Sequence, residues 1–295
     1  MQRGFVGVGT MGAPIVGHLV AAGHTVRAFD LSADALAKAQ AAGAQAADSV
    51  GEAAAGAQAV FVAVSNQDVL GEVLRQPGGI FECAAPGAIV VDLGTTAPPR
   101  CRAFAAEARA VGMDYVDAPL SGSTPWAQAG TLAVMVGAEQ AAWDTVLPLL
   151  QTFGGSIFHL GPVGSGQTAK LCQNLILVST LSGVMESVAR GRAVGIEPRR
   201  LLEVMDTCLA PTRVMDVLVK PKFDGRVPFD HSTEGLTMIC KDITLVRDLA
   251  QRVGVHLPVG SRIQSLYQQA VEKGHGRHDL LAWYELIEQG VFEAG

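Results

Sequence analysis

Residues 5–12 read FVGVGTMG, a short apolar run that ends in a glycine-rich turn. The turn lies between a predicted strand and a predicted helix, which is the context in which a G-x-G-x-x-G fingerprint binds a dinucleotide. The first glycine of such a turn permits the tight bend, the second lets the backbone approach a pyrophosphate, and the third lets helix and strand pack closely. The helix N-terminus then presents free N–H groups to the phosphates. We therefore expect the cofactor to be held by Gly7, Gly9, Thr10, Met11 and Gly12; the alternative is a turn with a structural role alone.

The first half of the chain alternates short apolar runs with alanine-rich segments. The runs FVGV, TVRAFD, AVFVAV, AIVVDL and MDYVDA are predicted strands. The segments between them are predicted helices, over residues 11–22, 33–41, 67–75 and 99–111. Such alternation indicates βαβ units and a parallel sheet. Two more predicted strands, 131–137 and 156–160, flank a predicted helix over 139–150. We therefore predict an α/β Rossmann domain over residues 1–162, with a doubly wound, mostly parallel sheet.

From about residue 163 the pattern changes to helices alone. Residues 167–193 contain no proline and no strand signal, so we predict one helix of about 27 residues, roughly 40 Å long. Further helices are predicted over 198–208, 232–253, 260–273 and 278–289, separated by segments with glycine or proline. The predicted second domain, residues 163–295, is therefore all-α and includes a long interdomain helix.

Composition excludes several classes of function. The 295-residue chain has a formal net charge of −6 and no block of Lys and Arg, so neither nucleic acid nor an anionic membrane is an expected partner. No segment has the uninterrupted apolar length of a membrane span, and the N-terminus lacks the order of a signal peptide. The five cysteines are scattered without a C-x-x-C pair and the seven histidines form no cluster. We expect a reducing cytoplasm and no metal site.

The second predicted strand should end at Asp30. A carboxylate at that place accepts hydrogen bonds from the adenosine ribose hydroxyls and repels a 2′-phosphate. Asp30 therefore favours NAD over NADP, although Arg27 offers an alternative contact for a phosphate. Because ligands bind at the carboxyl ends of strands in such a sheet, the turns after the third and fourth strands can line the nicotinamide half of the cofactor. The alternative, from these residues alone, is that they are ordinary turn residues. These turns hold Val64, Ser65 and Asn66 in one case and Thr95 in the other.

The segment GSGQTAKLCQNLILV, residues 164–178, contains Lys170, the only Asp, Glu, Lys or Arg between Asp144 and Glu186. Lys170 and Asn174 are four residues apart and project from one helix face, whereas we place Gln167 and Gln173 elsewhere on the turn. A lysine in an apolar setting has its charged form disfavoured, which suits acid/base work on a hydroxyl or carbonyl that the amide orients. The alternative is a lysine whose head reaches solvent.

Two other segments carry polar side chains in patterns that a ligand could use. Ser121, Gly122 and Ser123 follow the fifth predicted strand, and their backbone N–H groups and hydroxyls suit a carboxylate. From this segment alone, a serine-capped helix start is an equal alternative. Lys241 and Asp242 lie in CKDITLVRDLA, which by itself predicts an amphipathic helix with solvated charges.

Together these segments resemble the β-hydroxyacid dehydrogenases, the family of 3-hydroxyisobutyrate dehydrogenase and tartronate semialdehyde reductase. The resemblance covers nearly the whole chain through four ordered segments, FVGVGTMGAPIVGHL, DAPLSGSTPWAQAGTL, GSGQTAKLCQN and KDITLVRDLA. It implies that Lys170 is the catalytic acid/base with Asn174 as its partner on the substrate. It also implies that Ser121, Gly122 and Ser123 hold the substrate carboxylate, that Thr95 and Lys241 contact the cofactor, and that Asp242 supports the site. Members of the family are usually dimers or tetramers, so we expect a homodimer or homotetramer.

The sequence departs from the family at Ser123, where glycine is usual, at Ser65, where proline is frequent, and at Gln173, where asparagine is frequent. The related 6-phosphogluconate dehydrogenases carry a histidine and a glutamate where Gln173 and Leu177 stand, and leucine cannot serve decarboxylation. Related imine reductases replace the lysine. We therefore predict hydride transfer between NAD and the hydroxyl carbon of a small β-hydroxy acid, without decarboxylation. The alternatives are an imine or other carbonyl reductase on the same scaffold and a non-catalytic nucleotide-binding protein.

Overall fold

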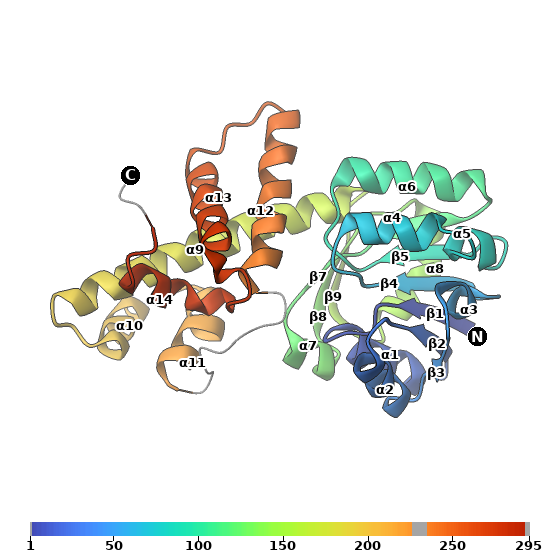
Figure 1. Cartoon of the computed structure of the whole chain (residues 1–295), viewed down its shortest axis with the longest axis horizontal. Coiled ribbons are helices and arrows are strands. Elements are labelled where there is room, and N and C mark those ends of the chain that lie inside the picture. Colours follow the sequence, from blue (N-terminus) through green and yellow to red (C-terminus); the bar gives the residue numbers. More distant parts are fainter. Residues whose placement is uncertain (1, 226–234, 293–295) are drawn as a thin grey trace. The chain divides into compact units, whose positions relative to one another are not determined.

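The computed structural model describes residues 2–225 and 235–292 of the chain, and the chain divides into two compact units after Lys170. Figure 1 colours the chain from the N-terminal unit in blue and green to the C-terminal unit in yellow and red. The first unit is α/β and the second consists of helices in its described part. Helix α9, Ser165–Ala193, begins in the first unit and continues in the second.

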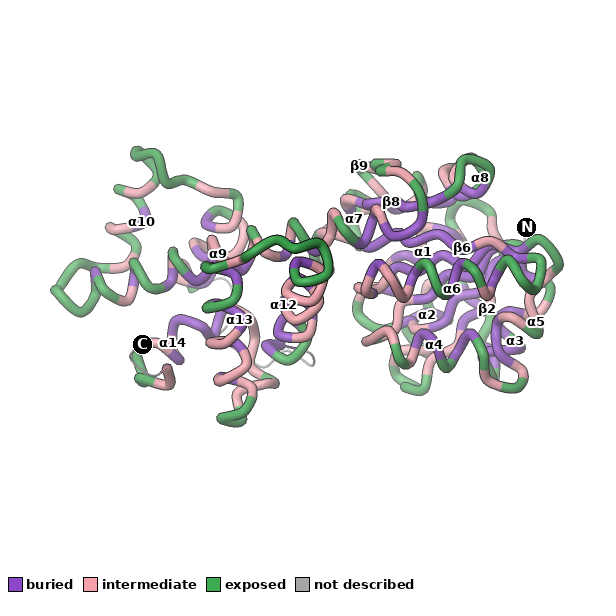
Figure 2. Tube along the Cα trace, turned by 90° about the horizontal axis from the view of Figure 1, so that it is seen from above, coloured by how far each residue is buried: buried purple, intermediate pink, exposed green. Residues whose placement is uncertain are grey.

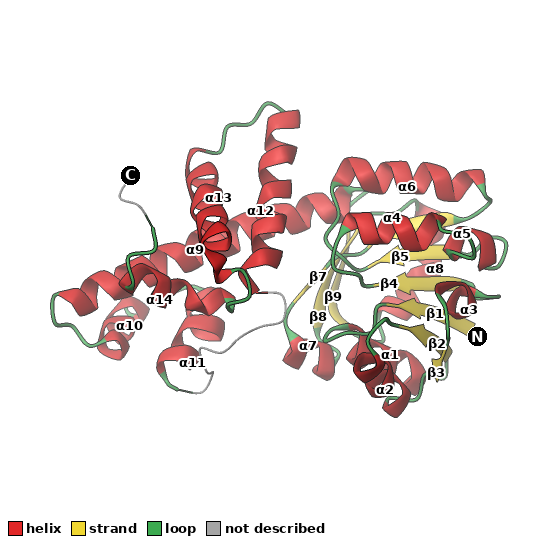
Figure 3. Cartoon of the chain, viewed as in Figure 1, coloured by secondary structure: helices red, strands yellow, loops and turns green. Residues whose placement is uncertain are grey.

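The first unit is built on a parallel sheet of six strands among its described residues, in the order β3-β2-β1-β4-β5-β6. Figure 3 shows these strands in yellow between red helices. The strands are β1 (Gln2–Val6), β2 (Thr25–Phe29), β3 (Gln45–Ala46), β4 (Ala59–Val62), β5 (Ile89–Asp92) and β6 (Asp114–Asp117). The predicted doubly wound parallel sheet of a Rossmann fold is therefore confirmed.

Helices cover both faces of this sheet because alternate strand residues point to opposite sides. On β4, Phe61 faces a core with α1, α2 and α8, whereas Val60 and Val62 face a second core with α3 to α6. Figure 2 shows mostly the purple of buried residues along β6, and β4 and β5 are buried throughout, whereas β3 is exposed. The helices are α1 (Gly12–Ala21), α2 (Ala33–Ala41), α3 (Val50–Ala54), α4 (Gln67–Arg75), α5 (Ile80–Cys83), α6 (Pro98–Ala110), α7 (Thr124–Ala129) and α8 (Gln140–Leu150).

A second, smaller sheet follows in the chain. It contains β7 (Leu120–Ser121), β8 (Leu132–Val136) and β9 (Gly154–His159), with β7 antiparallel and β9 parallel to β8. The sequence predicted β8 and β9 but not their separation from the main sheet. Several short elements, β3, α3, α5, β7 and α7, were not predicted, because two to six residues carry too little periodicity for a pattern to emerge.

The second unit packs its helices around one apolar cluster. Val178, Leu181, Met185 and Val188 of α9 are buried there with Trp283, whose ring stacks on Tyr267 at 4.0 Å between centroids. The α-helices after α9 are α10 (Pro198–Asp206), α11 (Lys220–Phe223), α12 (Gly235–Arg252), α13 (Pro258–Ala270) and α14 (Trp283–Glu288). π-helical turns lie at Met215–Val219 and Val271–His275, and a 3₁₀ turn at Leu280–Ala282. Residues 232–234 of the predicted helix 232–253 lie outside the described residues.

Helix α9 is long and apolar enough to cross a membrane by the test of length and composition, since an 18-residue window reaches a mean hydropathy of 1.3. Helices in the core of soluble proteins pass the same test, and α9 places four of its apolar side chains in the cluster around Trp283. That packing accounts for part of its apolar sequence, since 39% of the window is buried.

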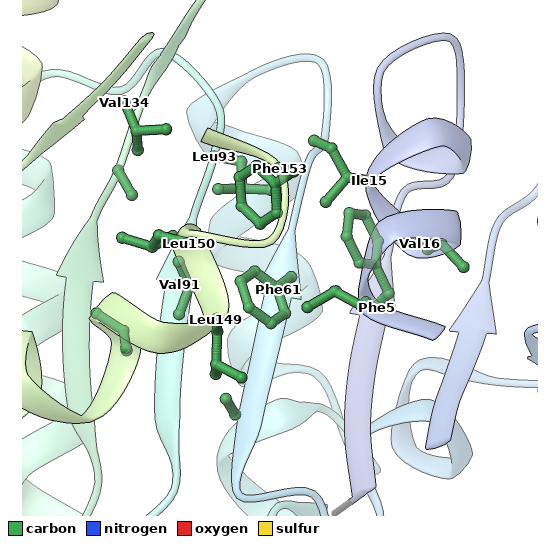
Figure 4. Packing of buried hydrophobic residues seen from close by; sticks show 14 of the residues in the cluster. Phe5, Ile15, Val16, Phe61, Val91, Leu93, Val134, Leu149, Leu150 and Phe153 are labelled. Atoms are coloured by element: carbon green, nitrogen blue, oxygen red, sulfur yellow. The ribbon is translucent and has the colours of Figure 1, made fainter. Parts of the chain in front are cut away.

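Three phenylalanines centre the core between the sheet, α1 and the segment after α8 (Figure 4). The Phe61 ring stacks on the Phe5 ring with 5.8 Å between ring centroids and meets the Phe153 ring edge-on with 6.2 Å between centroids.

We expect Phe61→Ala to lower the free energy of unfolding by about 3–5 kcal/mol, because it leaves a cavity that the close-packed sheet cannot fill. Chemical denaturation followed by fluorescence measures the change. Phe158→Ala is the matched control, since that side chain is 53% exposed on β9 and should change stability by less than about 1 kcal/mol. Equal effects of the two variants would contradict this description of the core.

Candidate active site

The glycine turn between β1 and α1 has the conformation that a dinucleotide site requires. Gly7 has a φ of 87°, and a Cβ there would lie 2.4 Å from the carbonyl oxygen of Ala63. A Cβ on Gly12 would lie 2.4 Å from the carbonyl oxygen of Gly7, so close packing of helix and strand depends on glycine. A Cβ on Gly9 would meet no atom within 4 Å, so the backbone there is open to an approaching group. Thr10 is exposed, and the N-cap residue Met11 makes no side-chain cap hydrogen bond, which leaves the N-terminus of α1 for an anion.

Asp30 follows β2 and holds the glycine turn through its carboxylate. Its Oδ2 accepts a hydrogen bond from Val8 N at 2.8 Å, and its Oδ1 accepts one from Ser32 N at 2.8 Å. A carboxylate oxygen has a second lone pair, so both oxygens can still accept ribose hydroxyls. Arg27 is half-buried within β2, and Leu31, which follows Asp30, is exposed.

The turn after β4 is organised by a helix cap. Asn66 Oδ1 accepts hydrogen bonds from Asp68 N at 2.9 Å and Val69 N at 3.0 Å, and this caps α4. The amide of Asn66 therefore has a structural function that needs no cofactor. Val64 is half-buried and Ser65 is exposed beside it at the carboxyl edge of the sheet.

The turn after β5 is held from two sides. Asp92, the last residue of β5, accepts hydrogen bonds from Gly94 N at 2.9 Å and from the hydroxyl of Thr96 at 2.8 Å. The Gln167 side chain, from α9, donates to Gly94 O at 2.8 Å and accepts from Thr96 N at 3.0 Å. Thr95 lies half-buried between these anchored neighbours.

In the sequence-based prediction, Gln167 lies elsewhere on the turn from Lys170 and has no assigned function. A helix turns by about 100° per residue, so Gln167 lies about 60° around from Lys170 and about 20° from Asn174. Gln167 is fully buried, which its polarity did not suggest. One signal in the sequence could have placed Gln167 near the candidate site: it precedes Lys170 by three residues and Asn174 by seven, spacings that bring side chains to nearby positions around a helix.

Asp117, the last residue of β6, anchors the start of α9. Its Oδ1 accepts a hydrogen bond from Gly164 N at 2.7 Å and its Oδ2 one from Gln167 N at 2.8 Å. The strand register places Asp117 beside Asp92. Burial raises the pKa of Asp117 to about 7 with help from the charge of Asp92, and the backbone hydrogen bonds oppose the rise. The sequence offered one signal for this pair, since Asp is the last residue but one of two consecutive predicted strands.

Asn174 and Asp242 form a buried pair within the second unit. Asn174, on α9, is 1% exposed and donates from Nδ2 to Asp242 Oδ2 at 2.9 Å. Lys241 Nζ lies 3.2 Å from Asp242 Oδ1, although that oxygen accepts no well-directed hydrogen bond from the described residues. Lys170 is half-buried at the end of the first unit, four residues before Asn174 on the same helix.

The interpretation of Lys241 and Asp242 as solvated charges was wrong for Asp242, which is 5% exposed. Asp242 lies among the buried residues of α12, next to Ile243 and three after Ile239. The amide of Asn174 and the nearby ammonium of Lys241 compensate the carboxylate for its burial.

The 121–123 turn has a fixed backbone and an uncommitted hydroxyl. Ser121 pairs with Ala133 in the small sheet. Gly122 has a φ of 129°, and a Cβ there would lie 2.8 Å from the Leu132 side chain, so glycine is required. Ser123 is the exposed N-cap residue of α7, but its side chain makes no cap hydrogen bond. The serine-capped alternative is therefore not realised by the hydroxyl.

Among residues 2–225 and 235–292, no group of three or more His, Cys, Asp or Glu side chains could hold a metal ion. The absence of a metal from the reaction stays a prediction.

Known proteins match the chain over nearly its whole length. Residues 2–161 match the family model described as the NAD-binding domain of 6-phosphogluconate dehydrogenase. Residues 164–287 match the one described as NAD-binding of NADP-dependent 3-hydroxyisobutyrate dehydrogenase. The chain is 35% identical to the NAD-dependent L-serine dehydrogenase of Pseudomonas aeruginosa, over 97% of this chain and 98% of that protein. The chain belongs to the β-hydroxyacid dehydrogenase family.

Other members of the family agree with this assignment. The 2-(hydroxymethyl)glutarate dehydrogenase of Eubacterium barkeri is 31% identical over 100% of this chain and 98% of its own. The structure of the 3-hydroxyisobutyrate dehydrogenase of Mycobacterium tuberculosis with L-serine has a TM-score of 0.85 and 28% identity, covering 97% of this chain and 98% of that one. This dehydrogenase is an NAD(P)-dependent oxidoreductase that acts on the CH–OH group of a hydroxy acid.

The buried carboxyl of Asp117 should make the stability of the dehydrogenase depend on pH. Its pKa rises from 3.8 to about 7 on folding, so the folded chain binds more protons than the unfolded chain between these values. Stability from this group is therefore greatest at low pH and is lost as pH rises through 7. Asp117→Asn removes the titrating carboxyl group and one hydrogen-bond acceptor. Loss of the acceptor lowers the free energy of unfolding by the same amount at every pH, so only loss of the titration depends on pH.

The free energies of unfolding of the wild type and Asp117→Asn should accordingly be compared at pH 5 and pH 8. We expect the variant to gain about 2 kcal/mol relative to the wild type at the higher pH. Asp144→Asn, an exposed change on α8, serves as the control. A difference between Asp117→Asn and the wild type that is equal at both pH values would contradict the protonation of Asp117.

Proposed function

We propose that this dehydrogenase uses NAD to oxidise a small β-hydroxy acid of the 3-hydroxyisobutyrate type to the semialdehyde, reversibly and without decarboxylation. The observation that carries the proposal is the buried hydrogen bond between Asn174 and Asp242, one helical turn after Lys170. An amide fixed by a buried carboxylate is a preorganised group for a substrate oxygen, and the ammonium on the same helix face can exchange a proton with that oxygen.

The glycine turn fits a dinucleotide, because Gly9 is open to approach and α1 has no side-chain cap. When bound, NAD supplies the acceptor for the hydride of the carbinol carbon. Residues 7–12 would hold the pyrophosphate and Asp30 the adenosine ribose. The nicotinamide half would be contacted by Val64, Ser65, Asn66, Thr95 and Lys241.

Lys170 acts as the general base in oxidation and as the general acid in reduction. In oxidation its amine accepts the proton of the substrate hydroxyl as the carbinol carbon loses its hydride and the C–O bond becomes a carbonyl. In reduction the ammonium returns the proton to the oxygen. Asn174 Nδ2 carries two N–H bonds and gives one to Asp242, so the second can donate to the substrate oxygen while Lys170 exchanges the proton of that oxygen. Ser121, Gly122 and Ser123 hold the substrate carboxylate through backbone N–H groups and hydroxyls.

The relatives suggest the substrate class. L-serine, 2-(hydroxymethyl)glutarate and 3-hydroxyisobutyrate, which appear in their names, share a primary alcohol on the carbon next to the one that bears the carboxylate. We infer that this chain acts on such hydroxymethyl acids. Leu177 cannot exchange a proton, which supports oxidation without decarboxylation.

We further propose a cytoplasmic homodimer or homotetramer without nucleic-acid or membrane partners. The acidic net charge and scattered cysteines support the compartment. We also place the boundary between the dinucleotide-binding and helical domains at residues 162 and 163, just before α9 begins.

A substrate panel tests the proposed function. We expect the purified chain to reduce NAD with at least one of 3-hydroxyisobutyrate, L-serine, glycerate or 2-(hydroxymethyl)glutarate, without releasing CO₂, and to leave cyclic imines unreduced. Lys170→Met should lower kcat about 10²- to 10⁴-fold, the contribution of general acid/base catalysis. Lys38→Met, on the exposed face of α2, is the matched control.

Three outcomes would contradict the proposal. Reduction of imines without oxidation of any hydroxy acid would indicate an imine reductase. NAD binding without turnover of any compound would indicate a nucleotide-binding protein without catalysis. Full activity of Lys170→Met would remove the lysine from the reaction.

Cofactor preference depends on Asp30. Both of its oxygens already accept backbone N–H groups, so the carboxylate is held rigidly where a 2′-phosphate would be repelled. We expect the wild type to prefer NAD in kcat/KM. Asp30→Asn should lower the NAD-to-NADP ratio by about tenfold, because it removes one charge repulsion of about 1.4 kcal/mol. Asp34→Asn, an exposed change in the first turn of α2, should leave the ratio unchanged. A wild-type preference for NADP would overturn the assignment.

A further inference from the structure

Gln167 is a fully buried glutamine whose side chain joins α9 to the turn after β5. Its Nε2 donates to Gly94 O at 2.8 Å and its Oε1 accepts from Thr96 N at 3.0 Å. The two bonds reach the residues immediately before and after Thr95. One amide therefore clamps the backbone on both sides of the residue that we assign to the nicotinamide half of the cofactor.

The opposite side of the same turn is held by Asp92. Gly94 N and the Thr96 hydroxyl both donate to that carboxylate, at 2.9 and 2.8 Å. The Tyr115 hydroxyl also donates to it, at 2.8 Å. Gly94 and Thr96 are thus each bonded once to β5 and once to α9, and Thr95 cannot move without breaking bonds of its neighbours.

The backbone of Gln167 is fixed as firmly as its side chain. Asp117 accepts the N–H groups of Gly164 and Gln167, and a Cβ on Gly166 would lie 2.3 Å from Met135 O. The first turn of α9 therefore has one position against the ends of β6 and β8. Lys170 follows Gln167 by three residues, about 4.5 Å along the helix axis.

We propose that Gln167 is a positioning residue that sets the distance between the Thr95 turn and Lys170. The proposal rests on the proposed function, since it assigns Thr95 to the cofactor and Lys170 to the proton. Hydride transfer needs the cofactor ring at the carbinol carbon, and proton transfer needs the lysine at the oxygen bound to that carbon. A displacement of about 1 Å in such a site can cost about 10²-fold in rate.

An apolar side chain of similar size separates this function from simple space filling. Gln167→Met fills the volume but leaves Gly94 O and Thr96 N without partners, which favours a rearranged turn. Gln167→Glu keeps an acceptor for Thr96 N but places a second carboxylate oxygen against Gly94 O. When that carboxylate is protonated its O–H can donate to Gly94 O, so the glutamate variant should recover as pH falls.

The test compares NADH with ADP-ribose, which contains the pyrophosphate and both riboses but lacks the nicotinamide ring. For Gln167→Met we expect the Kd of NADH to rise about tenfold while the Kd of ADP-ribose stays within about twofold, and kcat to fall about 10- to 100-fold. For Gln167→Glu we expect the ratio of its kcat to that of the wild type to increase as pH is lowered. Gln151→Met, an exposed glutamine of the same unit, is the matched control.

Equal losses of NADH and ADP-ribose affinity would show a purely structural role and overturn the proposal, as would a kcat of Gln167→Met within twofold of the wild type. The Kd values of NADH and ADP-ribose are both measured without a hydroxy acid, so the comparison between them remains valid even if the chain oxidises no compound of the substrate panel. If the wild type oxidises hydroxy acids and the two affinities are unchanged, Gln167 is not a positioning residue and the proposed function is unaffected.

Discussion

The start of α9 depends on one buried carboxylate. The first N–H groups of a helix have no partner within the helix, and here two N–H groups of the 164–167 segment are buried at the end of a strand. Asp117 accepts both of them. Burial of the carboxylate opposes its ionisation, which is why the pKa rises to about 7, but without it two backbone donors would be orphaned. Gln167 and Lys170 take their positions from this anchor because they lie within the next two turns.

The same device occurs at three strand ends of the parallel sheet. Asp30 after β2, Asp92 at the end of β5 and Asp117 at the end of β6 each turn a carboxylate toward backbone N–H groups of a nearby loop or helix start. Each of these hydrogen bonds satisfies a backbone donor that has no partner in a strand or helix. The carboxyl edge of a parallel sheet is where ligands bind. Aspartates there hold the loops at this edge in place while the strands beneath them remain apolar.

The sequence predicted the architecture well because alternation of strands and helices is a local pattern. The sheet, the long helix and the glycine turn follow from residues that are neighbours in the chain. The polar side chains of the candidate site were harder to interpret. Gln167 bonds to residues 71 and 73 positions away, and Asn174 bonds to a residue 68 positions away. The sequence pattern suggested solvent for Asp242 and gave no partner for Gln167, and only the long-range partners explain why both are buried. The family resemblance identified Asp242 but not Gln167, because it compared types of residue and not their bonds.

Rigidity is distributed unevenly over the candidate site. Among the groups that we propose for chemistry common to all substrates, Asn174 and Asp242 are buried and bonded to each other, and the turn around Thr95 is held by hydrogen bonds from two sides. The 121–123 turn differs, since its backbone is fixed by Gly122 while the hydroxyl of Ser123 is exposed and makes no cap bond. A change at Ser123 breaks no hydrogen bond of the helix cap, whereas a change at Gln167 leaves Gly94 O and Thr96 N without their hydrogen-bond partner. We therefore expect changes at the exposed turn to alter the proposed substrate selectivity without disturbing the groups that we propose to align the hydride and the proton.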